Sequence, residues 1–263
     1  MEHLFLIKLG GSLITDKGQE KVAKPEVMRR LAGEIRSALK KTDRKLVVAH
    51  GAGSFAHRSA TKYKVNEGLK GVLQFKGYPY VSSDAIQLNR KVMRQFLKVK
   101  LPAISFSPQS MIFSENRRAK SIFTDSLIHA LKLGYLPVLY GDTVFDKKIG
   151  FLIFSTEMVL GALTNVLYKK FKISFIYCGN TDGVFDSKGR TIPKITNKNI
   201  HEVEKFISGS ENVDVTGGMI HKVRESLEMA KKGHDTIIIN GNRKGELKKA
   251  ILGEKHRGTL ISG

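Results

Sequence analysis

Residues 4–12 read Leu-Phe-Leu-Ile-Lys-Leu-Gly-Gly-Ser, an apolar run that ends in two glycines and a serine. Such a run predicts a buried strand, and the glycines predict a loop at its carboxyl end. The pattern returns at residues 46–54, at 173–183 and at 236–242, each time as an apolar run followed by glycine. Repeated strands that end in glycine loops, with helices between them, indicate an α/β fold with a mainly parallel sheet.

Helical patterns occupy the segments between these strands. From Pro25, which suits a first helical turn, apolar side chains recur at every fourth position as far as Leu39. The predicted helices cover residues 25–41, 83–96 with Ser83 as cap, 124–134 with Thr124 as cap, 155–168 with Ser155 as cap, and 219–232. Further strands are predicted over residues 102–106, 136–140 and 259–261, and a hairpin over 144–154.

The composition excludes several kinds of protein. A chain of 263 residues with 41% hydrophobic residues can bury a large core, which argues against a largely disordered chain. Cys178 is the only cysteine, so neither an intrachain disulfide nor a multi-cysteine zinc site can form. No stretch reaches the ~18 apolar residues of a membrane span. Residues 1–8 lack the pattern of a signal peptide. We therefore expect a cytoplasmic protein with no membrane partner.

The net charge of +21 allows two interpretations, a nucleic-acid surface or an attraction for small anions. The basic residues are dispersed in pairs such as Lys40-Lys41, Arg117-Arg118 and Lys231-Lys232, as on solvated faces and helix ends. No zinc-finger or aromatic RNA-binding pattern accompanies them. We therefore favour small anionic ligands over nucleic acid.

The first glycine loop carries cations. Lys8 lies inside an apolar strand, and its ammonium needs an anionic partner unless the side chain reaches solvent. Gly10 and Gly11 expose backbone amides to which an anion can come close, and Lys17 adds a mobile charge. A tight structural turn would explain the two glycines equally well.

Two further loops repeat this chemistry. Residues 50–57 place glycines at the start of a predicted helix, where amides and the helix dipole favour phosphate, and His57 follows them. In the alternative, purely structural interpretation, His57 caps a loop or packs against it. Residues 214–219 precede another predicted helix, with Lys222 expected on its first turn. The spacing does not follow the P-loop pattern.

Three glycine loops with Lys8, Lys17 and Lys222 form a set that phosphoryl transfer needs. Its transition state spreads negative charge over the transferred group, and the protein mainly positions and neutralises that charge. The sequence offers no Ser-His-Asp arrangement. None is required where the acceptor is itself a phosphate oxygen.

The chain resembles a known family, the amino acid kinase superfamily, and within it the archaeal type of isopentenyl phosphate kinases. The resemblance runs from about Leu4 to Ile261. It rests on Lys8-Leu9-Gly10-Gly11-Ser12, residues 50–57, Gly141-Asp142, residues 214–219 with Lys222, and Asn240-Gly241-Asn242. It implies an open αβα sandwich, a homodimer, and ATP-dependent conversion of isopentenyl phosphate to isopentenyl diphosphate with Mg²⁺, in isoprenoid biosynthesis by an alternative mevalonate route.

The resemblance also implies an organisation and a set of site residues. Residues 1–263 form one domain, with an acceptor-binding and dimerising lobe to about 170 and a nucleotide-binding lobe from about 171. Lys8 and Lys222 hold the ATP phosphates, Lys17 bridges donor and acceptor, and His57 grips the acceptor phosphate. The remaining matches are Gly10, Gly11, Ser12, Gly53, Gly179, Asp182, Gly217 and Gly218 on the nucleotide side, and Ala52, Asp142, Thr156 and Glu157 on the substrate side. No residue is assigned as a metal ligand.

The chain departs from the family pattern beside the acceptor and the nucleotide. Ala52 and Ala56 replace glycines, and a methyl at Ala52 is expected to crowd the phosphate or to block a positive φ. Thr156-Glu157-Met158 stand where Gly-Asp-Asp is usual, so Glu157 would orient the lysines with a longer reach. Gly179-Asn180 replace a Thr-Asp pair.

Three hypotheses follow, in order of preference. The first is a kinase of isopentenyl phosphate. The second is a kinase of the same fold with another phosphorylated or phosphonate acceptor. The third is a degenerate kinase retained as a nucleotide- or RNA-binding protein, which the charge of +21 would suit. The joint presence of Lys8, Lys17, His57 and Lys222 argues against the third.

Overall fold

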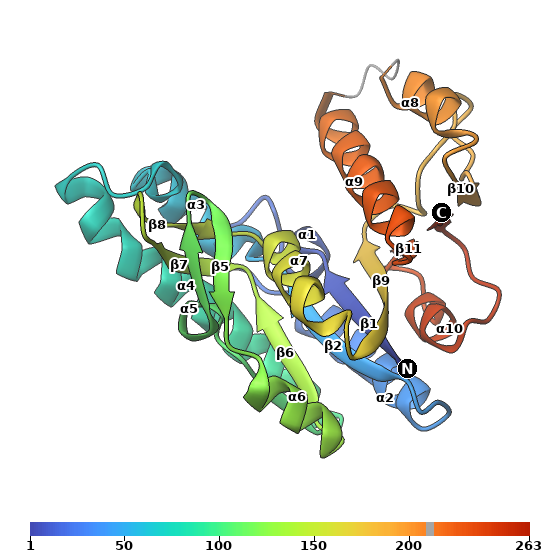
Figure 1. Cartoon of the computed structure of the whole chain (residues 1–263), viewed down its shortest axis with the longest axis horizontal. Coiled ribbons are helices and arrows are strands. Elements are labelled where there is room, and N and C mark those ends of the chain that lie inside the picture. Colours follow the sequence, from blue (N-terminus) through green and yellow to red (C-terminus); the bar gives the residue numbers. More distant parts are fainter. Residues whose placement is uncertain (209–212) are drawn as a thin grey trace.

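The computed structural model describes residues 1–208 and 213–263, and within this range it leaves the side chains of 207, 208 and 213–218 undescribed. Its centre is an eight-stranded sheet in the order β10-β12-β11-β9-β1-β2-β6-β3 (Figure 1). Among these strands only β11 and β12 pair antiparallel. The strands are β1 (Glu2–Leu9), β2 (Lys45–His50), β3 (Ala103–Ser105), β6 (Leu136–Tyr140), β9 (Phe171–Gly179), β10 (Lys194–Ile195), β11 (Thr236–Asn240) and β12 (Thr259–Ile261).

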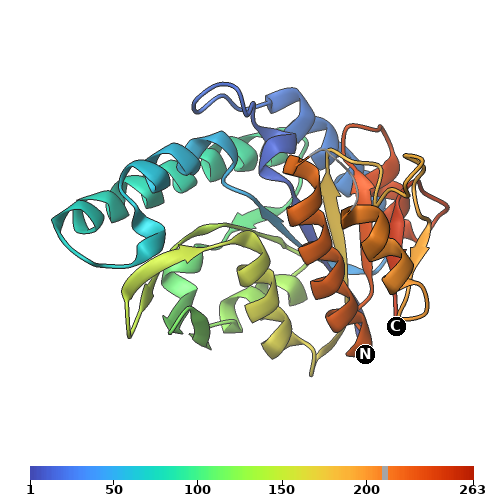
Figure 2. The ribbon, with the colours of Figure 1, turned by 90° about the horizontal axis from the view of Figure 1, so that it is seen from above.

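Helices cover both faces of this sheet because the strands are apolar on both faces. On β1, Phe5 and Ile7 join the core beneath α2 and α4, whereas Leu4 and Leu6 join the core beneath α6 and α7. Figure 2 shows these layers on opposite sides of the sheet. The helices are α1 (Gly11–Ile14), α2 (Pro25–Leu39), α3 (Gly53–Lys62), α4 (Val72–Lys98), α5 (Pro108–Met111), α6 (Asp125–Lys132), α7 (Thr156–Leu167), α8 (Ile200–Ser208), α9 (Val213–Lys231) and α10 (Glu246–Leu252), with a 3₁₀ turn η1 (Val65–Glu67). The predicted αβα sandwich with a mainly parallel sheet is confirmed.

A second, smaller sheet lies against the α6–α7 side, in the order β5-β4-β7-β8. The antiparallel pair β7 (Asp142–Asp146) and β8 (Gly150–Phe154) is the predicted hairpin. The other two strands, β4 (Ile112–Glu115) and β5 (Arg118–Ile122), were not predicted. Outward-facing Arg118 and Lys120 make β5 polar and exposed, so it carries no apolar run.

Two predicted helix starts and one predicted cap need correction. Ser83 lies inside α4, which begins eleven residues earlier at Val72 and continues through Pro79 on its solvent side. The Thr124 side chain precedes α6 without capping it, whereas Ser155 Oγ does accept a hydrogen bond from the Met158 amide at 3.2 Å. The last of the predicted helices, α9, begins at Val213 rather than Met219, so Lys222 lies near its middle and not on its first turn.

Candidate active site

A cavity of about 610 Å³ opens at the carboxyl ends of β1, β2 and β6, where ligands of open α/β sheets bind. All four predicted catalytic side chains line it, from four different segments of the chain: Lys8, Lys17, His57 and Lys222. Of the other predicted site residues, the cavity wall includes Gly10, Gly11, Ser12, Ala52, Gly53, Asp142, Thr156 and Glu157. The glycine loops that the sequence places after separate strands therefore meet in one site.

The two N-terminal glycine loops pack backbone against backbone. A Cβ on Gly11 would lie 2.5 Å from the Gly53 nitrogen, and one on Gly51 would lie 2.9 Å from the Gly11 nitrogen. Thr15 clasps the loops together, because its buried hydroxyl donates to the Gly11 carbonyl at 2.8 Å and accepts from the Ser54 amide at 3.0 Å. The absence of side chains here allows the two loops to form a single anion cradle.

A carboxylate holds the lysines near the cradle. Lys8 and Glu157 form a hydrogen-bonded ion pair across the cavity wall. Burial alone would raise the pKa of Glu157, but the ammonium of Lys8, its hydrogen bond and the charge of Lys222 outweigh burial and hold this pKa below its usual value. Glu157 is therefore an anion paired with Lys8, and the orienting role that the sequence predicts for it stays a prediction.

The electrostatics at Lys222 indicate a site built for anions. Burial lowers the pKa of Lys222, the positive charges of Lys8 and Lys17 lower it further, and Glu157 opposes them. The three ammonium groups therefore repel one another, and the carboxylate of Glu157 offsets only part of their charge. A polyphosphate between them would relieve that repulsion, since charge-assisted hydrogen bonds to phosphate are strong.

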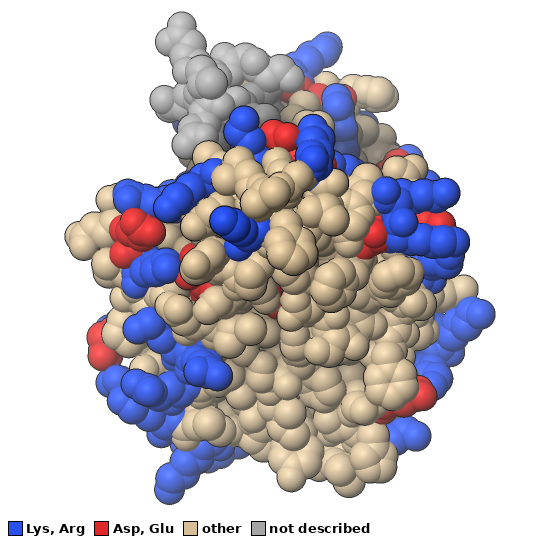
Figure 3. All heavy atoms as spheres, turned by 90° about the vertical axis from the view of Figure 1, so that its left-hand side faces the viewer, with Lys and Arg blue, Asp and Glu red and all other residues tan. Residues whose placement is uncertain are grey.

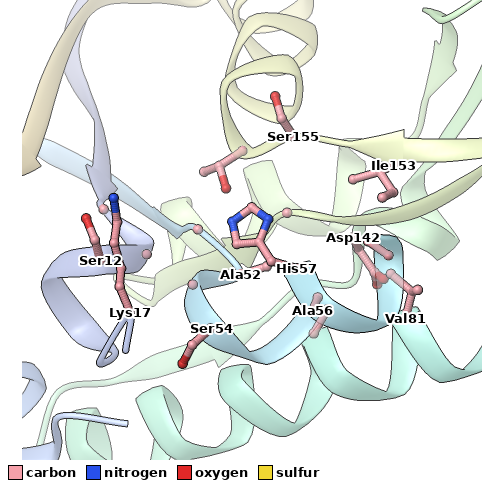
Figure 4. Close-up of a pocket in the computed structure, with 18 of the residues that line it drawn as sticks. Ser12, Lys17, Ala52, Ser54, Ala56, His57, Val81, Asp142, Ile153 and Ser155 are labelled. Carbon is pink, nitrogen blue, oxygen red and sulfur yellow. The ribbon is translucent and has the colours of Figure 1, made fainter. Parts of the chain in front are cut away.

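His57 stands in the middle of the cavity. It lies on the first turns of α3, whose amino end opens at Gly53 beside the cradle. In Figure 4 its ring has Ser12 and Lys17 on one side and Asp142 and Val81 on the other. His57 therefore separates a cationic half of the cavity from the half that holds α4. His50, by contrast, is buried below the site and stacks on Tyr140.

The far half of the cavity is apolar. Small and branched side chains from α3, α4 and β8 form its wall: Ala56, Ala60, Val81, Ala85 and Ile153. Ala56 was expected beside the acceptor, whereas the others, together with Gln19 and Arg58, were not predicted individually as site residues. Val81 and Ala85 are four residues apart on one face of α4, a spacing that would have indicated a common surface had the helix been predicted to start at Val72.

Asp142 borders the apolar half as a buried carboxylate. Oδ1 accepts from the Thr143 amide at 2.7 Å, whereas Oδ2 is buried without a hydrogen-bond partner of normal geometry. Burial raises the pKa of Asp142 to about 6, although hydrogen bonds from Thr143 and Ser82 act in the opposite direction. No lysine contributes to this shift, so Asp142 does not belong to the cationic cluster.

The raised pKa of Asp142 predicts a pH-dependent stability. The buried carboxyl prefers to be protonated, so its favourable contribution is complete below pH 3.8 and is lost as the pH rises through about 6. Asp142→Asn removes the cost of ionisation. At pH 8 the variant should be more stable than the parent by about 2–3 kcal/mol, and the difference should vanish near pH 4. Urea unfolding of both proteins from pH 4 to 8 measures it. A difference that does not change with pH would contradict the assignment.

Three substitutions relative to the pattern of the family that the chain resembles are accommodated by the fold. Ala52 has φ −70°, so its methyl blocks no positive φ, contrary to one expectation. Thr156 is buried and its hydroxyl donates to the His50 carbonyl at 2.9 Å, which ties α7 to the end of β2. Ala56 packs with Val65, Val81 and Phe151 in a small core under the cavity.

Two predicted nucleotide-side residues, Gly179 at the end of β9 and Asp182 in the loop after it, lie outside the cavity wall. The Gly179 carbonyl accepts from the Gly241 amide at 2.7 Å. Asp182 pairs with Arg243 and accepts from Asn240 at 2.7 Å, and these contacts hold its pKa below the usual range. Ser12 links the two regions, because Asn180 donates to its hydroxyl at 3.1 Å. Gly217 and Gly218 belong to the segment without described side chains, so their predicted role lies outside the described residues.

Over the residues with described side chains, no three His, Cys, Asp or Glu side chains cluster as a ligand set for a metal ion. Over the same part of the chain, every helix is too short or too polar to cross a membrane.

Comparisons with known proteins find similar sequences and a similar fold. The model of the amino acid kinase family matches residues 3–240. The isopentenyl phosphate kinase of Methanocaldococcus jannaschii is 33% identical over 95% of this chain and 96% of its own length. That of Methanothermobacter thermautotrophicus is 30% identical over 99% of both. A crystal structure of an isopentenyl phosphate kinase covers 99% of this chain and 100% of its own, with a TM-score of 0.81 at 28% identity.

Proposed function

The chain belongs to the amino acid kinase family, and on that premise we propose that it is an isopentenyl phosphate kinase, which uses ATP to convert isopentenyl phosphate to isopentenyl diphosphate. The convergence of Lys8, Lys17, His57 and Lys222 on one cavity carries the proposal. The apolar half of that cavity adds room for a short hydrocarbon tail beside the phosphate site. The named relatives, which match the chain over nearly its whole length, support this choice of acceptor.

The reaction needs little covalent chemistry from the protein. An oxygen of the acceptor phosphate forms a bond to the γ-phosphorus of ATP, while the bond to the bridging oxygen breaks and its electron pair leaves with ADP. The acceptor oxygen is already anionic at neutral pH, so no general base is required. Lys8, Lys17 and Lys222 neutralise the charge that spreads over the transferred group, and the amides of the cradle bind its oxygens.

We place the acceptor and the nucleotide on opposite sides of the lysine cluster. His57 binds the acceptor phosphate, and the tail lies along Val81 and Ala85. The nucleotide phosphates lie over Gly10 and Gly11, and the rest of the nucleotide extends toward β9 and β11. In this arrangement the lobe up to about residue 170 binds the acceptor, and the lobe from about residue 171 binds the nucleotide. Magnesium enters bound to the phosphates of ATP, as part of the substrate.

We also propose a cytoplasmic homodimer, since ATP is the donor and one face of the molecule suits a second copy. Figure 3 shows that face as a broad area with few charges, bordered by Lys and Arg. The elements at this end of Figure 1 expose several large apolar side chains, which in a monomer would form an unusual patch: Leu69, Val72, Phe75, Tyr80, Phe113 and Phe145. Light scattering of the purified protein measures the mass.

A panel of acceptors tests the proposed function. ADP release is measured with isopentenyl phosphate, dimethylallyl phosphate, inorganic phosphate, a phosphonate and a carboxylate amino acid. We expect the branched five-carbon monophosphates to give the highest kcat/KM. Preference for the phosphonate or the amino acid would move the chain to another acceptor class, and the absence of ADP release with any acceptor would favour a degenerate kinase.

His57→Ala tests the assignment of the acceptor side. The variant loses the donor to the acceptor phosphate, so KM for isopentenyl phosphate should rise about 30-fold or more, as for the loss of a charge-assisted hydrogen bond. The KM for ATP should change little. His201→Ala, at an exposed position on α8 far from the cavity wall, serves as control. Equal increases in both KM values would remove His57 from the acceptor site.

A further inference from the structure

The loop of residues 16–22 carries Lys17 and Gln19 to the cavity. It leaves the sheet after α1 and returns to α2, and it projects as the blue loop at the top of Figure 2. Its base is closed by the Asp16 amide, which donates to the Val22 carbonyl at 2.9 Å, and by a bridge between Thr15 and Ala23. Beyond this base the loop has no regular structure, so contacts with neighbouring elements must fix the position of Lys17.

Lys17 itself has no carboxylate partner among the described residues. The loop is held instead by two ion pairs from its far side. Lys21 Nζ lies 2.6 Å from Asp84 Oδ1 on α4, and Glu20 Oε2 lies 3.0 Å from Arg58 on α3. The Lys21 amide adds a long hydrogen bond of 3.4 Å to the Ser54 carbonyl of the second glycine loop.

The two ion pairs differ in burial. The Asp84 side chain is only 7% exposed, whereas Glu20 and Arg58 are 48% and 63% exposed. An exposed pair contributes little, because water and salt screen it. A buried carboxylate that loses its partner is costly, so Asp84 holds Lys21 firmly. Lys21 also has φ +56°, a conformation that a residue other than glycine keeps only where its surroundings impose it.

We propose that Asp84 is a positioning residue for catalysis: through Lys21 it anchors the loop that presents Lys17 to the transferring phosphoryl group. The inference rests on the proposed kinase function and adds to it a residue outside the cavity wall. The neighbouring residue on α4, Ala85, lines the acceptor half of the cavity. The same turn of α4 therefore supports both the acceptor tail and the lysine that faces the acceptor phosphate.

The kinetic test compares two variants that each remove one carboxylate charge from a tether of this loop. Asp84→Asn frees the loop, and kcat/KM for isopentenyl phosphate should fall about 10- to 100-fold, the loss expected when a catalytic group is displaced by about an ångström. Asp84→Glu keeps the charge and should restore most of the rate. Glu20→Gln removes the exposed pair and should change kcat/KM less than about twofold. Equal effects of Asp84→Asn and Glu20→Gln would overturn the proposal.

A double variant distinguishes positioning from a general loss of structure. If Asp84 acts only through Lys17, then Asp84→Asn should cause no further loss of kcat/KM when Lys17 is already alanine. Losses that multiply would show that Asp84 acts by another route, and the proposal would fail. Thermal unfolding of all variants accompanies these assays.

Hydrogen exchange tests the anchor without reference to the reaction. In Asp84→Asn, the hydrogen-bonded amides of Asp16 and Lys21 should exchange at least about tenfold faster than in the parent, while those of β1 and β2 remain unchanged. Unchanged exchange in the loop would overturn the proposal even if the enzyme is active. Faster exchange in a protein that phosphorylates none of the acceptors would instead support the anchor and refute the proposed function.

Discussion

Lys222→Met should lower kcat by about 10³-fold, with a much smaller change in the KM for isopentenyl phosphate, because the lysine acts on charge that develops in the transition state. Its position carries this expectation. Lys222 faces Lys8, Lys17 and Glu157 in the cavity, and burial together with the two ammonium groups lowers its pKa. Such a cation is poorly solvated without substrate, so its interaction with the transferring phosphoryl group is strong. Methionine keeps the length and apolar stem of the side chain and removes the charge.

Lys231→Met provides the matched control for this variant. Lys231 lies on the same helix, α9, but its side chain is half exposed and pairs with Glu228. The substitution should leave kcat within about twofold of the parent, since an exposed pair contributes little. Steady-state kinetics with both substrates and rapid-quench measurement of the first turnover separate chemistry from product release. A Lys222→Met variant whose first turnover is as fast as the parent's would exclude the lysine from the chemical step.

The architecture could be predicted because its signals are local. The apolar runs of β1, β2, β9 and β11 are short, nearly free of charge and end at or just before a glycine, so these strands were recognisable one at a time. The predictions that failed also have physical reasons. Pro79 and Gly77 resemble helix breakers, yet α4 passes through both. Packing requires glycine at position 77, since a Cβ there would lie 2.1 Å from the Tyr63 side chain. Tertiary packing overrides propensity at that point.

The candidate site also has a part that could be predicted from the sequence and a part that could not. The residue types of the cationic half could be predicted, because Lys8, Lys17 and His57 stand beside glycine loops. Their partners could not be. Glu157 is 149 positions from Lys8, and Asp84 is 63 positions from Lys21, so only the fold shows which carboxylate serves which lysine. The predicted nucleotide-side role of Asp182 stays a prediction, since its carboxylate pairs with Arg243 outside the cavity wall.

Gly11→Ala should abolish most activity without altering a single charged group. The added Cβ would lie 2.5 Å from the nitrogen and 2.7 Å from the Cα of Gly53, both backbone atoms that cannot rotate away. The two glycine loops must then separate, and the Thr15 hydroxyl loses the geometry that joins them. We expect kcat/KM to fall by at least about 10²-fold for both ATP and isopentenyl phosphate, since both phosphates share this cradle. Overpacking should also lower the free energy of unfolding by about 1–3 kcal/mol.

Gly10→Ala is the graded comparison, because the same methyl one residue earlier meets the Cys178 carbonyl at 3.4 Å and the Gly179 Cα at 3.6 Å, which are ordinary contacts. Its loss of kcat/KM should be far smaller than that of Gly11→Ala. Isothermal titration with a nonhydrolysable ATP analogue separates binding from chemistry, and thermal unfolding tests whether each variant folds. If Gly11→Ala folded normally and bound nucleotide and acceptor like the parent, the close packing of the two loops would have no bearing on phosphate binding. A loss confined to one substrate would mean that the loops serve separate phosphates, so the shared cradle requires that both substrates weaken together.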